Sequence, residues 1–224
     1  MYEKEKELLK NKERFTTEDL LLIIKILRAK DGCPWDAEQT HESIIPGLIE
    51  ETYETVEAIE MGSPEMLCEE LGDVLLQIAF HSDISSDAGE FDYTDVVSGV
   101  CRKMIVRHPH VFGDVHVENS KEVLKNWDKI KAETKFQSGL HEKLSSVAKP
   151  LPALMRAQKL IHKAAKENVR PSENLLSGAE GEAANALLSA IYKCEELDVN
   201  AETVLRHLSD AFIEQVSGNG AQQE

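Results

Sequence analysis

The sequence predicts an all-α protein, in which an N-terminal helical bundle is followed by a smaller helical region. Leucine, glutamate, alanine and lysine dominate the composition, and aromatic residues make up only 5% of the 224 residues, which favours helices over sheets. No segment alternates polar and apolar residues at every second position, as a half-buried strand would. Apolar residues account for 42% of the chain, which is enough to build a hydrophobic core.

The helices expected in the N-terminal region are separated by clear breakers. Residues 1–15 are a charged lead-in with little to bury. The first helix contains the apolar run Leu20–Leu27 and ends at the breaker cluster Asp31–Pro34. Pro46 is expected to mark the first turn of the second helix. The later helices of this region are expected at 42–61, 65–82, 93–107 and 121–135.

A polar linker at 137–149 is expected to separate a catalytic domain at 16–136 from a second helical region at 150–217. Within that second region the expected helices are 153–167, 182–197 and 201–216. Residues 218–224 are rich in glycine and glutamine, and we predict that they form a disordered tail.

The net charge of −16 restricts the classes of partner. An acidic protein does not attract the phosphate backbone of nucleic acids or an anionic membrane surface through its general field. No apolar run is long enough to span a bilayer, and the first 14 residues lack the apolar stretch of a secretory signal. The cysteines are scattered without a CxxC pair, so we expect reduced thiols in a cytoplasmic protein: Cys33, Cys68, Cys101 and Cys194.

Carboxylates gather on one side of the helix expected at 42–61. At 100° per residue they fall within about a third of the circumference, opposite the apolar side. On its own this pattern is more typical of an amphipathic helix with a solvated acidic face. The residues are Glu50, Glu51, Glu54 and Glu57.

The helix expected at 65–82 favours a metal site instead. Glu70 and Asp73 lie one turn apart, and Asp73 stands in a segment that is apolar nearly all round. A buried carboxylate must be protonated, paired with a cation or bound to a metal. Because lysine and arginine are absent from residues 42–84, a metal is the natural partner. All-oxygen ligands favour Mg²⁺ or Mn²⁺, whereas a di-iron site needs a Glu-x-x-His pairing that neither helix contains.

These motifs resemble the EExxE…ExxD signature of MazG-type nucleoside triphosphate pyrophosphohydrolases. The resemblance extends over roughly residues 20–163. It is carried by EETYE at 50–54, ELGD at 70–73, CPWDAEQTH at 33–41, RHPHVFGDV at 107–115 and LPALMRAQK at 151–159.

The resemblance implies an all-α, MazG-like homodimer whose Mg²⁺ ligands are Glu51, Glu54, Glu70 and Asp73. Glu50, beside the ligands, would orient or deprotonate the attacking water.

The resemblance also implies a set of substrate-binding residues. Lys103 and Arg107 would contact the triphosphate, although surface positions offer an alternative explanation for both. The other residues are Trp127 and Lys131 near the substrate, and Trp35 and Asp36 toward the nucleotide; Trp127 is also typical of a core and Trp35 of a loop anchor.

The activity implied is Mg²⁺-dependent hydrolysis of nucleoside triphosphates to monophosphate and pyrophosphate, which removes unwanted nucleotides from the pool. The acids would hold the cation, and the basic residues would stabilise charge on the phosphoryl oxygens. The second helical region resembles a degenerate copy of the domain, because no second EExxE follows Ala165. The alternative is a metal- or nucleotide-binding regulatory protein with little turnover.

Overall fold

The computed structural model describes residues 2–134, 139–170 and 175–220, with side chains up to 217. These residues form twelve helices and no strand, so the prediction of an all-α fold is confirmed. The chain divides into two compact units, Met1–Val115 and His116–Glu224. No helix in the described ranges combines the length and the apolarity needed to cross a bilayer.

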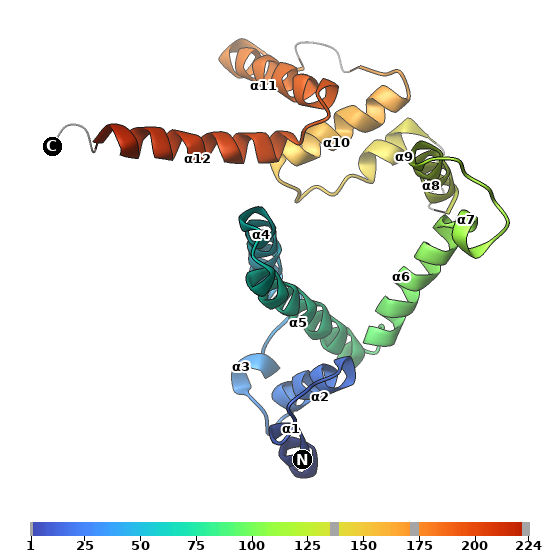
Figure 1. Ribbon diagram of the computed structural model, residues 1–224, viewed down its shortest axis with the longest axis vertical. Coiled ribbons are helices and arrows are strands. Elements are labelled where there is room, and N and C mark those ends of the chain that lie inside the picture. Colours follow the sequence, from blue (N-terminus) through green and yellow to red (C-terminus); the bar gives the residue numbers. More distant parts are fainter. Residues whose placement is uncertain (1, 135–138, 171–174, 221–224) are drawn as a thin grey trace. The chain divides into compact units, whose positions relative to one another are not determined.

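The first unit is built around a long antiparallel hairpin of α4 and α5 (Figure 1). The chain reverses at Gly62, which adopts a left-handed φ of 65° at the C-cap of α4. Its helices are α1 (Glu3–Lys10), α2 (Thr17–Arg28), α3 (Pro34–Ala37), α4 (Ile45–Met61), α5 (Pro64–Ala88), α6 (Tyr93–Arg107) and α7 (Pro109–Phe112).

The core of this unit lies where α2 crosses the C-terminal half of α5. Ile24 of α2 is fully buried, and it clusters with Ile44, Ala79 and Phe80. A capping box in which Thr16 and Asp19 exchange hydrogen bonds fixes the start of α2. Pro46 occupies the first turn of α4, as the sequence predicts.

Helix α5 continues to Ala88, about six residues beyond the end expected from the sequence. The polar residues near 82–87 predicted a stop, but they are accommodated within the helix. Ser82 and Ser85 are buried, and the Ser82 hydroxyl donates to the carbonyl of Ile78 at 2.8 Å. The helix ends at Gly89, whose φ is 70°.

The described part of the second unit contains five helices, three of which pack around a common core. Its core joins α10 and α11 to the start of α12 through Ile161, Ile191 and Ala201. The bounds are α8 (Ser120–Thr134), α9 (Leu140–Ser145), α10 (Ala153–Lys166), α11 (Gly178–Glu196) and α12 (Ala201–Gly220).

The second unit differs from the sequence-based segmentation in three ways. It begins at His116 rather than near 137, since α8 belongs to it through an ion pair of 2.5 Å between Asp128 and Lys166. Helix α9 lies inside the segment expected to be a linker, where the apolar Val147 is buried. Helix α12 continues to Gly220, into the expected tail, and residues 221–224 fall outside the described part.

Candidate metal and nucleotide site

The facing sides of α4 and α5 meet in a regular antiparallel register. Gly47 lies opposite Gln77, so closely that an added Cβ would stand 2.8 Å from the Gln77 amide nitrogen. One turn nearer the Gly62 reversal, Glu51 faces Asp73 and Glu70. The acidic side chains therefore occupy the middle of the seam between the two helices.

Three carboxylates converge at this point. Glu51, Glu70 and Asp73 each offer an oxygen, and these oxygens all lie within 4.8 Å of one another. All three side chains are half-buried. No other group of three metal-ligating side chains at this spacing occurs among the residues that the structure describes. Two helices that are 17 and 25 residues long hold the cluster, and the i, i+3 spacing on α5 presents two of its members on one face.

The cluster is electrostatically uncompensated by its own helices. Desolvation raises the pKa of Glu51, and the negative charges of Asp73 and Glu54 raise it further. Desolvation likewise raises the pKa of Glu70, with Glu54 and Glu69 as the next contributors. Neither α4 nor α5 contains lysine or arginine. The seam therefore favours uptake of protons or of a cation.

Glu54 and Glu50 take different positions relative to the cluster. Glu54 is exposed, and its negative charge helps to raise the pKa of both Glu51 and Glu70, so it lies at the edge of the cluster. Glu50 is exposed and is not part of the converging group.

Helix α4 turns Glu51 toward α5 and part of its apolar surface toward solvent. Ile45, Ile49 and Tyr53 recur every four residues and form an exposed stripe. Ile44, Gly47 and Ala58 lie on the side that packs against α5. The sequence pattern of α4 predicts an apolar side opposite the acids, and this side is only partly covered within one chain.

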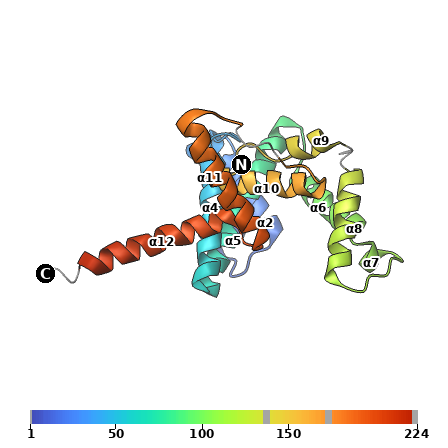
Figure 2. The same ribbon diagram turned by 90° about the horizontal axis from the view of Figure 1, so that it is seen from above.

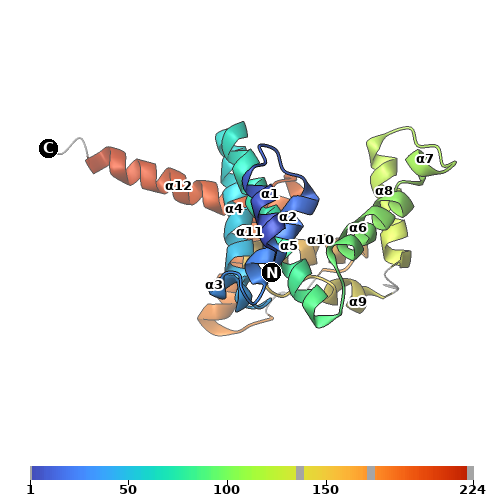
Figure 3. The same ribbon diagram turned by 90° about the horizontal axis from the view of Figure 1, so that it is seen from below.

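The basic pair lies on a helix that diverges from the hairpin. Figure 1, Figure 2 and Figure 3 all show α6 leaving the end of α5 and running away from α4. Lys103 is exposed, whereas Arg107 is buried at the last turn of α6. Trp127 and Lys131 are half-buried on α8, in the second unit, where their i, i+4 spacing places them on one side of that helix.

Trp35 and Asp36 lie on the short helix α3, beside α2. Asp36 is buried, but the Trp35 side chain is 66% exposed. The backbone that follows this tryptophan is held by Arg28, whose guanidinium donates to the carbonyls of Asp36 and Gln39. The sequence-based reasoning missed this arginine. Only its place after a long apolar helix and just before the breaker cluster sets it apart in the sequence.

Two histidines that the sequence analysis did not assign to the site join the loop before α4 to α5. The Nδ1 atoms of His41 and His81 are 2.7 Å apart, so one must donate to the other. The second nitrogen of His41 lies 3.1 Å from the hydroxyl of Ser85, which in turn donates to Glu90 at 3.3 Å. Burial and the neighbouring His41 lower the pKa of His81.

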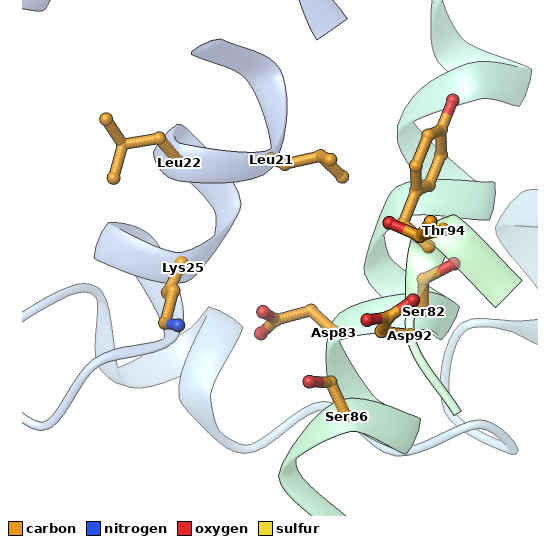
Figure 4. A pocket seen from close by; sticks show the side chains of 9 residues that line it. Leu21, Leu22, Lys25, Ser82, Asp83, Ser86, Asp92 and Thr94 are labelled. Atoms are coloured by element: carbon orange, nitrogen blue, oxygen red, sulfur yellow. The ribbon is translucent and has the colours of Figure 1, made fainter. Parts of the chain in front are cut away.

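A separate recess of about 230 Å³ opens between α2, α5 and the start of α6 (Figure 4). The Asp83 carboxylate points into it from α5 toward Lys25 (Figure 4). None of the clustered carboxylates lines it, so this recess is distinct from the acidic seam. It is lined by Leu21, Leu22, Lys25, Ser82, Asp83, Ser86, Asp92, Tyr93 and Thr94.

An all-α hairpin with carboxylates converging across its seam places this chain in the class of helical proteins with an acidic cluster between two antiparallel helices. The model of the MazG nucleotide pyrophosphohydrolase domain matches residues 39–112, which include the acids of both helices. The nucleoside triphosphate pyrophosphohydrolase/pyrophosphatase MazG of Thermotoga maritima is 35% identical over 215 residues, covering 88% of this chain and 82% of the relative. The chain therefore belongs to the MazG nucleotide pyrophosphohydrolase family.

Other relatives are similar over the N-terminal part of the chain. The nucleoside triphosphate pyrophosphohydrolase of Escherichia coli is 45% identical over 142 residues, which cover 63% of this chain and 54% of that protein. The uncharacterized protein YabN of Bacillus subtilis is 49% identical over 138 residues, covering 62% of this chain and 28% of that protein. The chain thus spans only about half, or less, of the length of these two relatives.

Proposed function

We propose that this protein hydrolyses nucleoside triphosphates to monophosphate and pyrophosphate, at a site built on Glu51, Glu54, Glu70 and Asp73. The observation that carries the proposal is the convergence of three carboxylates in a seam that contains no lysine or arginine. The printed names of the relatives from Escherichia coli and Thermotoga maritima support the same reaction. Removal of unwanted nucleotides from the cellular pool is the role that fits such an activity.

The proposed cofactor is Mg²⁺, with Mn²⁺ as a substitute. The donor set fits, because the cluster offers only carboxylate oxygens and hard divalent cations prefer oxygen. Its half-buried position leaves one side accessible to phosphate groups. When bound, the ion would link the acidic seam to the triphosphate, neutralise developing charge and lower the pKa of a water.

The remaining residues are assigned by their chemistry. Lys103, Arg107 and Lys131 would stabilise negative charge on the phosphoryl oxygens. Glu50, exposed next to the cluster, would orient or deprotonate the attacking water. The nucleotide end of the substrate would meet Trp35, Asp36 and Trp127.

We further propose that the working form is a homodimer. The exposed stripe of Ile45, Ile49 and Tyr53 gives α4 a second apolar side that the single chain leaves open. A second copy of the hairpin would cover such a stripe and complete a four-helix arrangement. Because α6 diverges from the hairpin, a second copy would also offer Lys103 a route to the acids of its neighbour.

The cysteines support a cytoplasmic location, the net charge restricts the classes of partner, and the second helical region is assigned a separate role. All four cysteines are free thiols, which fits the cytoplasm, and the net charge of −16 argues against nucleic-acid and membrane partners. The region 150–217 is proposed to be a degenerate copy that serves packing or dimerisation.

The experiment is a panel of nucleoside and deoxynucleoside triphosphates assayed for pyrophosphate release, with Mg²⁺ and with EDTA. We expect Mg²⁺-dependent release that Asp73→Asn abolishes. Glu57→Gln is the matched control, because Glu57 is an exposed glutamate on α4 outside the cluster. Nucleotide binding without pyrophosphate release would instead establish the alternative, a metal- and nucleotide-binding regulatory protein.

A further inference from the structure

A single buried guanidinium joins three segments of the first unit. The side chain of Arg28, at the end of α2, is only 8% exposed. Its Nε donates to Asp83 at 2.7 Å and its Nη2 to Asp87 at 3.2 Å, both on α5. Its Nη1 donates to two backbone carbonyls of the Cys33–His41 loop, those of Asp36 at 3.1 Å and Gln39 at 3.4 Å.

Side chains of the same loop continue this network. The Gln39 amide donates to the carbonyl of Trp35 at 2.7 Å, and the Ser43 hydroxyl donates to the Gln39 side-chain oxygen, also at 2.7 Å. Polar contacts therefore hold the backbone at Trp35, at Asp36 and at Gln39. The loop is attached to α5 through Arg28 near Trp35 and through His41 at its end, which contacts His81 and Ser85.

The indole of Trp35 consequently stands on a fixed backbone while most of its surface faces solvent. A tryptophan that anchored the loop would be buried, so the exposure argues against the loop-anchor explanation. An aromatic ring on a fixed backbone is suited to stacking, because the conformational freedom of that backbone is already lost before the ligand arrives. Stacking on a nucleobase tolerates every base and contributes strongly to binding.

The position along α5 at which Arg28 binds agrees with a nucleotide that extends from the acidic cluster to the Cys33–His41 loop. Asp83 follows Asp73 by ten residues, which corresponds to about 15 Å along the helix axis. This separation is on the scale of a nucleoside triphosphate, with its phosphates at one end and its base at the other.

We propose that Arg28 is a positioning residue for nucleotide binding: it fixes the Cys33–His41 loop so that Trp35 stacks on the base. The inference rests on the proposed function, since it assigns the base to a site whose phosphates lie at the acidic cluster. Arg28 acts through Trp35 and takes no part in bond cleavage. The planar guanidinium group of Arg28 is required for this positioning. A lysine at the same place could keep one ion pair but could not form four directed hydrogen bonds.

The kinetic test compares Arg28→Lys with Asp87→Asn in the full chain. Arg28→Lys is expected to raise KM about 5- to 10-fold, within the range that loss of one stacking contact allows, and to change kcat less than about 2-fold. Asp87→Asn removes an ion pair of Arg28 but no contact to the loop, so KM should stay unchanged. Equal KM values for Arg28→Lys and the unaltered protein would overturn the inference.

A double-mutant cycle separates positioning from general destabilisation. Trp35→Ala alone should raise KM, and Arg28→Lys should add almost nothing in the Trp35→Ala background, since both substitutions remove the same contact. Additive effects would show that Arg28 acts elsewhere. If Arg28→Lys fails to fold, Gln39→Ala replaces it. This change keeps Arg28 but removes the side-chain bonds to the Trp35 carbonyl and from the Ser43 hydroxyl, and it should raise KM in the same direction.

A readout without turnover distinguishes this inference from the proposed function. The chain has two tryptophans, so its ¹H–¹⁵N spectrum holds two indole signals, and Trp35→Phe assigns one of them. Arg28→Lys should shift or broaden the Trp35 signal, and Asp87→Asn should not. An unmoved signal defeats the inference even if pyrophosphate is released. If the Trp35 signal moves in Arg28→Lys but the unaltered protein releases no pyrophosphate, the proposed function is wrong. The assignment of Trp35 to base stacking then falls with it.

Discussion

The two compact units use their helix–helix seams in opposite ways. In the first unit, α4 carries five glutamates and no lysine or arginine, and Glu51 faces Glu70 and Asp73 across the seam. In the second unit, α10 carries four basic residues and no acid, and Ile161 packs against Ile191. The α10–α11 seam closes around apolar side chains, whereas the α4–α5 seam gathers carboxylates whose charges repel one another.

The polar side chains of the second unit also satisfy one another. Gln158 donates to the Val199 carbonyl at 2.8 Å and accepts from the Ala201 backbone amide at 2.8 Å, while Glu195 bonds to His162. These contacts join α10 to α11 and to the start of α12. The difference between the units indicates that polar residues stabilise the fold in one and remain available for ligands in the other.

The largest expected effect comes from removing one charge from the acidic seam. Asp73→Asn should lower turnover at least about 100-fold, because even partners outside a metal's ligand shell affect activity 10- to 100-fold. In EDTA the same change should raise the melting temperature, since it relieves repulsion with Glu51. In Mg²⁺ the order should reverse, because the unaltered protein binds the ion more tightly. Melting curves that show Asp73→Asn less stable in EDTA would contradict the repulsive seam.

Mixed copies test whether one site draws on two chains. If Lys103 serves the acids of a neighbouring copy, a mixture of Lys103→Ala and Asp73→Asn chains contains dimers with one intact site. Random pairing should then restore about a quarter of the unaltered activity. A mixture of Asp73→Asn with Glu51→Gln is the control, because both changes damage the same side of the site. No recovery in the first mixture would place Lys103 and the acids within one chain.

Substitutions in the apolar seam between α10 and α11 should change the stability of the second unit rather than the rate of turnover. Ile161→Ala deletes a buried side chain and should lower the free energy of unfolding of that unit by about 3 kcal/mol. Calorimetry should show one transition moving to lower temperature while kcat changes little. The equivalent change in the core of the first unit, Ile24→Ala, is the comparison. It should lower both the transition temperature of that unit and kcat. A large fall in kcat with Ile161→Ala alone would give the seam between α10 and α11 a direct part in the site.

The smallest expected effect is a pH dependence from the histidine contact. His81 has a lowered pKa, so the folded state stays unprotonated where unfolded histidine, with a pKa near 6.5, takes up a proton. Stability is therefore complete above about pH 6.5 and falls as pH drops toward the lowered pKa. His81→Asn should flatten this part of the stability curve relative to the unaltered protein. Identical stability curves for His81→Asn and the unaltered protein would exclude the histidine contact as the cause of the pH dependence.

Much of this architecture could be predicted because the deciding interactions are local. The capping box at Thr16 and Asp19, the proline in the first turn of α4 and the breakers around Gly62 act within a few residues, so the sequence alone indicates these helix boundaries. The i, i+3 spacing of Glu70 and Asp73 fixes their common face on any helix. The absence of lysine and arginine from residues 42–84 was likewise sufficient to predict a need for a cation.

Tertiary structure decided what local pattern leaves open. Which side of α4 meets α5 depends on packing, and it placed Glu51 in the seam while Ile45 and Ile49 stayed exposed. The extension of α5 to Ala88 and the role of Arg28 depend on partners 55 and 59 residues away. Contacts between residues so far apart leave no characteristic spacing in the sequence. The intervening chain limits how far apart the two residues can lie, but it does not determine which residues come into contact.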